Sequence, residues 1–143
     1  PSTSSSSLNG SGGTGYTLTY YAPYIRLVSN KTPTFKCTDT GDRFATSIGL
    51  ITADEVAYAG GVSSSYNRGY YLYTGENYWT LSPSYFNDIE TVGDVILVFS
   101  DGMVNYGYGV FSEFGVRPVI SLKADTTFAV GGTGTSSNPY VVS

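Results

Sequence analysis

The sequence predicts a single α+β domain of antiparallel strands and hairpins, with one short, well-capped helix and long loops. Three observations carry this prediction. A capping-box pattern precedes a short helical segment, an Asp-Gly pair separates two strand-like segments, and Gly, Ser and Asn interrupt the apolar runs throughout. The 143 residues suit one domain that buries a real core.

The beginning of the chain divides into a tail and a first structured segment. Residues 1–15 are rich in Ser and Gly and form a tail or linker, and residues 16–143 form the domain. Apolar residues alternate from residue 16 and the alternation breaks at Pro23, which predicts a strand, a kink and a second short strand over 24–28. The turn-rich stretch that follows leaves room for one short strand at Thr34–Thr38.

The strongest local signal predicts a helix over residues 53–59. Thr52 is placed as its N-cap and Glu55 completes a capping box, while Ile51 and Val56 are placed to pack across the cap. A Gly-Gly pair at 60 and 61 then ends the helix. Capping accounts for the neighbouring acidic residues, so they need no catalytic role.

Loops and a hairpin follow the helix. Residues 62–78 form a long loop with a brief strand at Tyr70–Tyr73, Trp79 begins an apolar anchor segment, and residues 84–94 form a polar loop. Asp101 and Gly102 form a two-residue type I′ turn between strands 95–100 and 103–110. Counting back from this turn predicts a core-facing set of cross-strand pairs, which are Phe99 with Val104, Leu97 with Tyr106 and Val95 with Tyr108.

The last third of the chain predicts a strand over 114–123 and a loop ending in a short strand within 127–143. Pro118 confines the first of these strands to a sheet edge or a bulge, because proline cannot donate to the ladder. Arg117 precedes it on an apolar strand. We expect its side chain to pair internally with an acidic residue, since a buried guanidinium needs a partner.

Composition excludes several kinds of chemistry. Only 13% of residues are charged, the net charge is −4 and the basic residues are scattered, so we expect no nucleic-acid partner. The chain has no histidine, the usual general base near neutral pH and a common metal ligand. Cys37 is the only cysteine, and we expect it to be buried or paired with a second chain. We therefore expect no catalytic residues, no metal and no cofactor.

Three segments, in this order, carry a resemblance. They are GLITADEVAYAGG, YLYTGENYWTLSPSYF and GVRPVISLKADTTFAVGGTGTSSNPYVV. Together they resemble modules of exported and prepilin-like proteins of Gram-positive and related bacteria, over residues 36–143. More distantly, the order is similar to the C-type-lectin-like fold of formylglycine-generating enzymes and of variable proteins of diversity-generating retroelements.

This resemblance implies a C-type-lectin-like scaffold in which Trp79 and Arg117 are structural. The catalytic relatives use cysteine chemistry, and the only cysteine here lies outside the three segments, so their activity is not implied. The Glu-Pro-Asn-like and Trp-Asn-Asp-like runs of calcium-dependent lectins do not occur. What the resemblance implies is a binding scaffold.

Tyrosine is the remaining functional signal, with 14 residues against 7 Phe. Tyrosine offers a broad amphipathic contact surface at low entropic cost. We expect seven tyrosines in or beside the loops and the hairpin to form a contact surface: Tyr66, Tyr70, Tyr71, Tyr73, Tyr78, Tyr85 and Tyr106. The alternative is that Tyr replaces Phe in a half-wet core.

These observations favour a non-catalytic extracellular or cell-surface module for adhesion or assembly. Its partner would be a protein or a glycan, or copies of the same chain in a pilus-like appendage. Alternatively, the chain is a purely structural filament subunit whose residues 1–15 pack on a neighbour. No apolar run is long enough to span a bilayer, and the start at Pro1 without an initiator Met leaves room for a removed N-terminal anchor.

Overall fold

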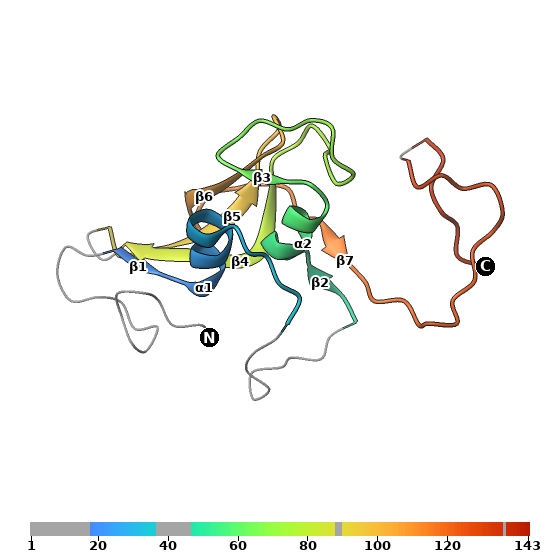
Figure 1. Ribbon diagram of the computed structural model, residues 1–143, viewed down its shortest axis with the longest axis horizontal. Coiled ribbons are helices and arrows are strands. Elements are labelled where there is room, and N and C mark those ends of the chain that lie inside the picture. Colours follow the sequence, from blue (N-terminus) through green and yellow to red (C-terminus); the bar gives the residue numbers. More distant parts are fainter. Residues whose placement is uncertain (1–17, 37–46, 88–89, 136) are drawn as a thin grey trace.

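The computed structural model describes residues 18–36, 47–87, 90–135 and 137–143, and the statements that follow concern these residues (Figure 1). The described part is mostly β, with a few short helices, which agrees with the predicted α+β class. A five-stranded sheet has the order β1-β4-β5-β6-β3, and a second sheet pairs β2 with β7. The predicted tail 1–15 and Cys37 lie outside the described residues.

The large sheet is antiparallel except at one edge, where β3 runs parallel to β6. Its five strands are β1 (Leu18–Tyr20), β4 (Tyr78–Asn87), β5 (Val92–Val98), β6 (Met103–Gly109) and β3 (Val62–Ser63). The small sheet consists of β2 (Gly49–Leu50) and β7 (Pro118–Val119), which pair antiparallel.

The predicted second strand over 24–28 is wrong, because this segment is helical. Helix α1 (Ala22–Tyr24) continues as a π-helix, η1 (Ile25–Asn30). Pro23 lies in the first turn of the helix, where its missing N–H costs no intrahelical hydrogen bond. It is buried together with Leu27, one turn further on. The strand predicted at Thr34–Thr38 is absent over residues 34–36, and residues 37–38 lie outside the described ranges.

Helix α2 (Ala53–Tyr58) and its cap confirm the prediction for this segment. The Glu55 backbone N–H donates to Thr52 Oγ1 at 3.2 Å, and the Thr52 backbone N–H donates to Glu55 Oε2 at 2.7 Å. Ile51 and Val56 are both buried in the core. Gly60 follows with a φ of +109°, a left-handed conformation that ends the helix.

Strand β4 covers the predicted anchor segment and the first residues of the predicted loop 84–94. The loop prediction is therefore wrong over 84–87, which belong to β4, and over 92–94, which belong to β5. The side chains of β4 alternate, and Tyr78, Thr80, Ser82 and Ser84 are buried. Polar residues are tolerated inside because most of them find partners. Thr80 Oγ1 donates to the Ile96 carbonyl, and Ser82 Oγ accepts from the Ala53 N–H at 2.9 Å.

The hairpin of β5 and β6 exists, but its turn and its register differ from the prediction. The loop has three residues, because the Phe99 N–H donates to the Met103 carbonyl at 2.9 Å. Gly102 has a φ of +83° and Asp101 has no positive φ, so the turn is not type I′. Asp101 keeps its structural role, since its Oδ1 accepts from the Met103 N–H at 2.9 Å.

The longer loop shifts the pairing by one residue at the turn end. Val98 pairs with Val104 in place of Phe99, and Leu97 pairs with Asn105 in place of Tyr106. A register shift between Val95 and Leu97 then restores the predicted Val95–Tyr108 pair. A slip of one residue reverses the faces, so Ile96 and Val98 lie in the main core instead of Phe99.

The main core packs against one face of the large sheet. In Figure 1, the helices α1 and α2 lie in front of this sheet. It consists of Leu27, Ile51, Ala53, Val56, Tyr70, Tyr78, Ile96, Val98 and Val104. Leu97 is fully buried outside this cluster. A chain of ring contacts links Trp79 to Phe114, Phe114 to Tyr108 and Tyr108 to Phe99, with centroids 5.0–5.5 Å apart.

The predicted strand over 114–123 is reduced to the two residues of β7, and Pro118 lies at an edge as predicted. Residues 120–143, which we call the C-terminal arm, then lead away from the sheets (Figure 1, orange to red). The arm holds two isolated bridges, Phe128–Val142 and Thr135–Asn138, in place of the predicted last strand.

Candidate functional site

The seven tyrosines predicted to form a contact surface do not form one surface. Tyr70 and Tyr78 are buried in the main core, with 7% and 3% of their surfaces exposed. Tyr66 and Tyr71 are largely exposed, at 76% and 69%. The other three, Tyr73, Tyr85 and Tyr106, are half-buried. Burial removes Tyr70 and Tyr78 from any surface that a partner could touch.

Tyr85 and Tyr106 belong to an aromatic cluster with Tyr20 and Tyr24, which the sequence did not single out. The ring centroids of Tyr20 and Tyr24 are 4.4 Å apart, and those of Tyr24 and Tyr106 are 5.0 Å apart. Tyr20 pairs with Tyr85 across β1 and β4, at 5.7 Å between centroids. Edge-to-face packing of Tyr24 against Tyr85 and Tyr106 joins α1 to the sheet.

A buried carboxylic acid lies beside this cluster. Asp94 is 7% exposed, and the Tyr85 hydroxyl forms a side-chain hydrogen bond to it. Burial raises the pKa of Asp94 above its usual value; the bond from Tyr85 lowers the pKa and the nearby Glu90 raises it. Burial and the same carboxylate raise the pKa of Tyr85. This pair anchors two adjacent strands to one another.

The two tyrosines of the main core, Tyr70 and Tyr78, lie near Arg117. Its Nη1 donates to the Leu72 carbonyl at 2.6 Å, and its guanidinium carbon lies 5.3 Å from the centroid of the Tyr78 ring. The Tyr78 hydroxyl donates to the same carbonyl at 3.3 Å. Burial raises the pKa of both Tyr70 and Tyr78, and the positive charge of Arg117 opposes this rise.

The predicted acidic partner of Arg117 is therefore wrong for the part of the chain that the structure describes. A backbone carbonyl and an aromatic face take its place, and no carboxylate among the described residues pairs with this guanidinium. The cation that does pair with a buried acid is Arg26, whose Nε and Nη2 donate to Asp54 at 3.1 and 2.7 Å. Asp54 also accepts from the Thr34 N–H at 2.9 Å.

Arg117 contributes to a cavity of about 650 Å³ between the 70–77 loop and the C-terminal arm. Its lining residues are Tyr71, Tyr73, Thr74, Arg117, Thr133, Gly134 and Thr135. Gly134 has a φ of +75°, and a Cβ there would lie 3.1 Å from the Tyr71 hydroxyl and 2.6 Å from the Tyr140 ring. Only glycine fits at this point, where the arm approaches the loop. We call this space the Arg117 cavity.

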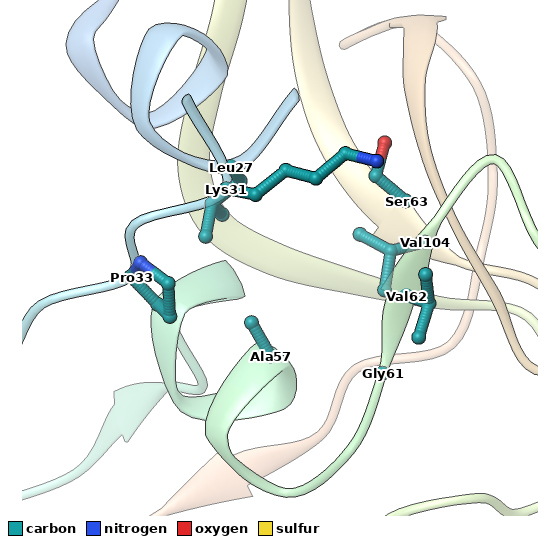
Figure 2. Close-up of a pocket in the computed structure, with 8 residues that line it drawn as sticks. All are labelled: Leu27, Lys31, Pro33, Ala57, Gly61, Val62, Ser63 and Val104. Carbon is teal, nitrogen blue, oxygen red and sulfur yellow. The ribbon is translucent and has the colours of Figure 1, made fainter. Parts of the chain in front are cut away.

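Two apolar cavities lie elsewhere. One, of about 260 Å³, opens beside β3, and Figure 2 shows the Lys31 side chain stretched across it toward Ser63. The other, of about 200 Å³, is lined by Leu50, Trp79, Thr80, Val95 and Val110. We call this second space the Trp79 groove. Trp79, predicted to be structural, is one of its lining residues and contacts Phe114 at 5.0 Å between ring centroids.

The described residues contain no cluster of three or more acidic or cysteine side chains that could hold a metal ion. Among the described helices, none combines the length and the apolar character needed to cross a membrane. No protein-family model matches the chain, and searches of curated proteins and of solved structures find no match.

Proposed function

We propose that this chain is a non-catalytic extracellular module that assembles with copies of itself through its C-terminal arm. One observation carries the proposal: the arm exposes a run of large apolar side chains. They are Ile120, Leu122, Phe128, Val130, Tyr140, Val141 and Val142, each at least 47% exposed. Large exposed apolar patches mark interaction sites on soluble proteins.

The Trp79 groove offers a matching surface on the same chain. Val110, which lines the groove, is 63% exposed; its chain neighbour Phe111 is 76% exposed, and Leu81, two residues after Trp79 on β4, is 60% exposed. An apolar arm and an apolar groove on one molecule fit a head-to-tail contact between copies. Such heterologous contacts build open chains when the rotation does not close a ring. A head-to-tail contact of this kind supports the pilus-like assembly that the prepilin-like resemblance suggests. The pilus-like assembly and the C-type-lectin-like scaffold are both part of the proposal.

The apolar side chains of the arm are the direct test. We expect the Ile120→Asp/Leu122→Asp double variant to weaken self-association by at least tenfold, because burial of one such side chain contributes roughly 1.5–3 kcal/mol and about 1.4 kcal/mol is tenfold in affinity. Sedimentation equilibrium over micromolar to millimolar concentrations measures this change. Ser121→Asp is the matched control, since it adds a charge at an exposed position between the two.

A wild-type chain that remains monomeric up to millimolar concentration overturns the proposal, and so does a double variant that associates as strongly as Ser121→Asp. The alternative, a filament subunit held by its tail, predicts that deletion of residues 1–15 abolishes assembly. The arm proposal predicts that this deletion leaves the association constant unchanged.

A further inference from the structure

We infer that the Arg117 cavity binds an acidic sugar, with the guanidinium of Arg117 taking the carboxylate and the surrounding hydroxyl groups taking the sugar hydroxyls. This goes beyond the proposed assembly: Thr133, Gly134 and Thr135 belong to the arm, but none of the cavity residues lines the Trp79 groove or is among the exposed apolar side chains of the arm that carry that proposal. The cavity, of about 650 Å³, falls within the usual range of small-molecule sites.

The carboxylate preference follows from the state of Arg117. Its side chain is half-buried; Nη1 donates to the Leu72 carbonyl, and the guanidinium also contacts the face of Tyr78 and forms a side-chain hydrogen bond with that residue. A guanidinium has five N–H donors in a planar fork, so most of them have no partner among the described residues. The lining residues include no carboxylate to compete for them. A ligand carboxylate would accept hydrogen bonds from the N–H groups of the guanidinium that the fold leaves available.

The preference for a hydroxylated ligand follows from the rest of the wall. Thr74, Thr133 and Thr135 contribute hydroxyls whose existing hydrogen bonds, at 3.1–3.5 Å, lie mostly near the outer limit of hydrogen bonding. Tyr71 and Tyr73 add two aromatic faces and two phenol groups, of which the Tyr73 hydroxyl donates to the Ser100 carbonyl at 3.1 Å. A wall of hydroxyl groups and aromatic faces suits a sugar ring better than a simple anion, which would use Arg117 alone.

The test titrates ¹⁵N-labelled full-length chain with glucuronate, glucose and acetate at constant ionic strength and follows amide chemical shifts. We expect glucuronate to bind at least tenfold more tightly than glucose, which lacks the carboxylate, and than acetate, which lacks the hydroxyls. The shifted amides should include those of residues 71–74 and 133–135. Equal binding of glucuronate and acetate shows an anion contact alone and overturns the sugar assignment, and equal binding of glucuronate and glucose overturns the role of the carboxylate.

Variants assign the site to these residues. Arg117→Gln should lower glucuronate affinity at least tenfold, while Arg68→Gln, the same charge change at an exposed arginine outside the cavity, should leave it unchanged. Since Arg117 also supports the fold, Thr133→Val/Thr135→Val provides a second variant at exposed positions, expected to lower affinity three- to tenfold without changing the melting temperature. Unchanged affinity in the threonine variant, or an equal loss in Arg68→Gln, overturns the assignment.

The two proposals fail separately. Val110→Asp alters the groove and lies outside the cavity, so a monomeric Val110→Asp chain should bind glucuronate like the wild type. Glucuronate binding with no self-association would remove the assembly proposal alone. Self-association with no glucuronate binding would remove the cavity proposal alone.

Discussion

At the scale of single residues, several side chains have a different role in the structure from the one that the sequence predicted. Tyr70 and Tyr78 are core residues, although their position in a Gly-rich stretch favoured a surface role. Arg117 contacts a backbone carbonyl and a tyrosine ring in place of the predicted carboxylate. Sequence spacing could not reveal either outcome, because the partners come from different parts of the chain. Thr52 and Glu55 were predictable since their contacts are local.

Asp94 gives a prediction at this scale. Its raised pKa means that the folded chain binds the proton more tightly than the unfolded chain, so the acid contributes stability at low pH that is lost as pH rises above 3.8. Asp94→Asn removes the ionisation and keeps an oxygen that can accept from Tyr85. We expect the variant to melt at a higher temperature than the wild type at pH 7, and this advantage to shrink toward pH 4.

Thermal unfolding by circular dichroism between pH 4 and pH 8 measures that difference. Asp125→Asn, at an exposed position in the arm, is the control and should leave the pH profile unchanged. A constant offset between Asp94→Asn and the wild type at every pH would contradict the assigned cause.

At the scale of elements, the sequence predicted those that depend on local signals. The capping box predicted α2, and the Asp-Gly pair predicted the hairpin of β5 and β6 but not its three-residue loop. Pro23 suggested a break between strands, whereas it lies in the first turn of α1. The sequence predicted an apolar anchor segment and then a loop where β4 lies, because the distant backbone groups that satisfy its buried hydroxyls cannot be found from local sequence. Apolar residues over 114–123 suggested a long strand, but within the described part of the chain this segment pairs only through β7 with β2 and through an isolated bridge from Gly115 to Tyr78.

The cap of α2 gives a prediction for this element. Thr52→Ala removes the side-chain acceptor for the Glu55 N–H, and we expect it to cost about 1 kcal/mol of unfolding free energy. Thr52→Ser keeps the hydroxyl and should retain most of the stability. Urea unfolding monitored by Trp79 fluorescence compares the two. Equal midpoints for both variants would show that the cap contributes little to the stability of the domain.

At the scale of the whole molecule, the sequence predicted assembly as one of two roles but placed it in the tail and the tyrosine loops. The described structure exposes large apolar side chains along the C-terminal arm, and Val110 of the Trp79 groove is exposed as well. Apolar residues in a sequence predict buried side chains, but they do not show which part of the protein covers them. In the described structure some of these side chains are exposed, and in the proposed assembly a second copy of the chain would cover them.

Complementation between two defective chains tests this arrangement most directly. Val110→Asp damages the groove and keeps the arm, whereas Ile120→Asp/Leu122→Asp damages the arm and keeps the groove. Light scattering after size-exclusion chromatography should find each variant alone as a monomer of about 15.2 kDa. An equimolar mixture should form a heterodimer of twice that mass and stop there. A mixture that stays monomeric, or variants that each still form larger species alone, would contradict assembly from arm to groove.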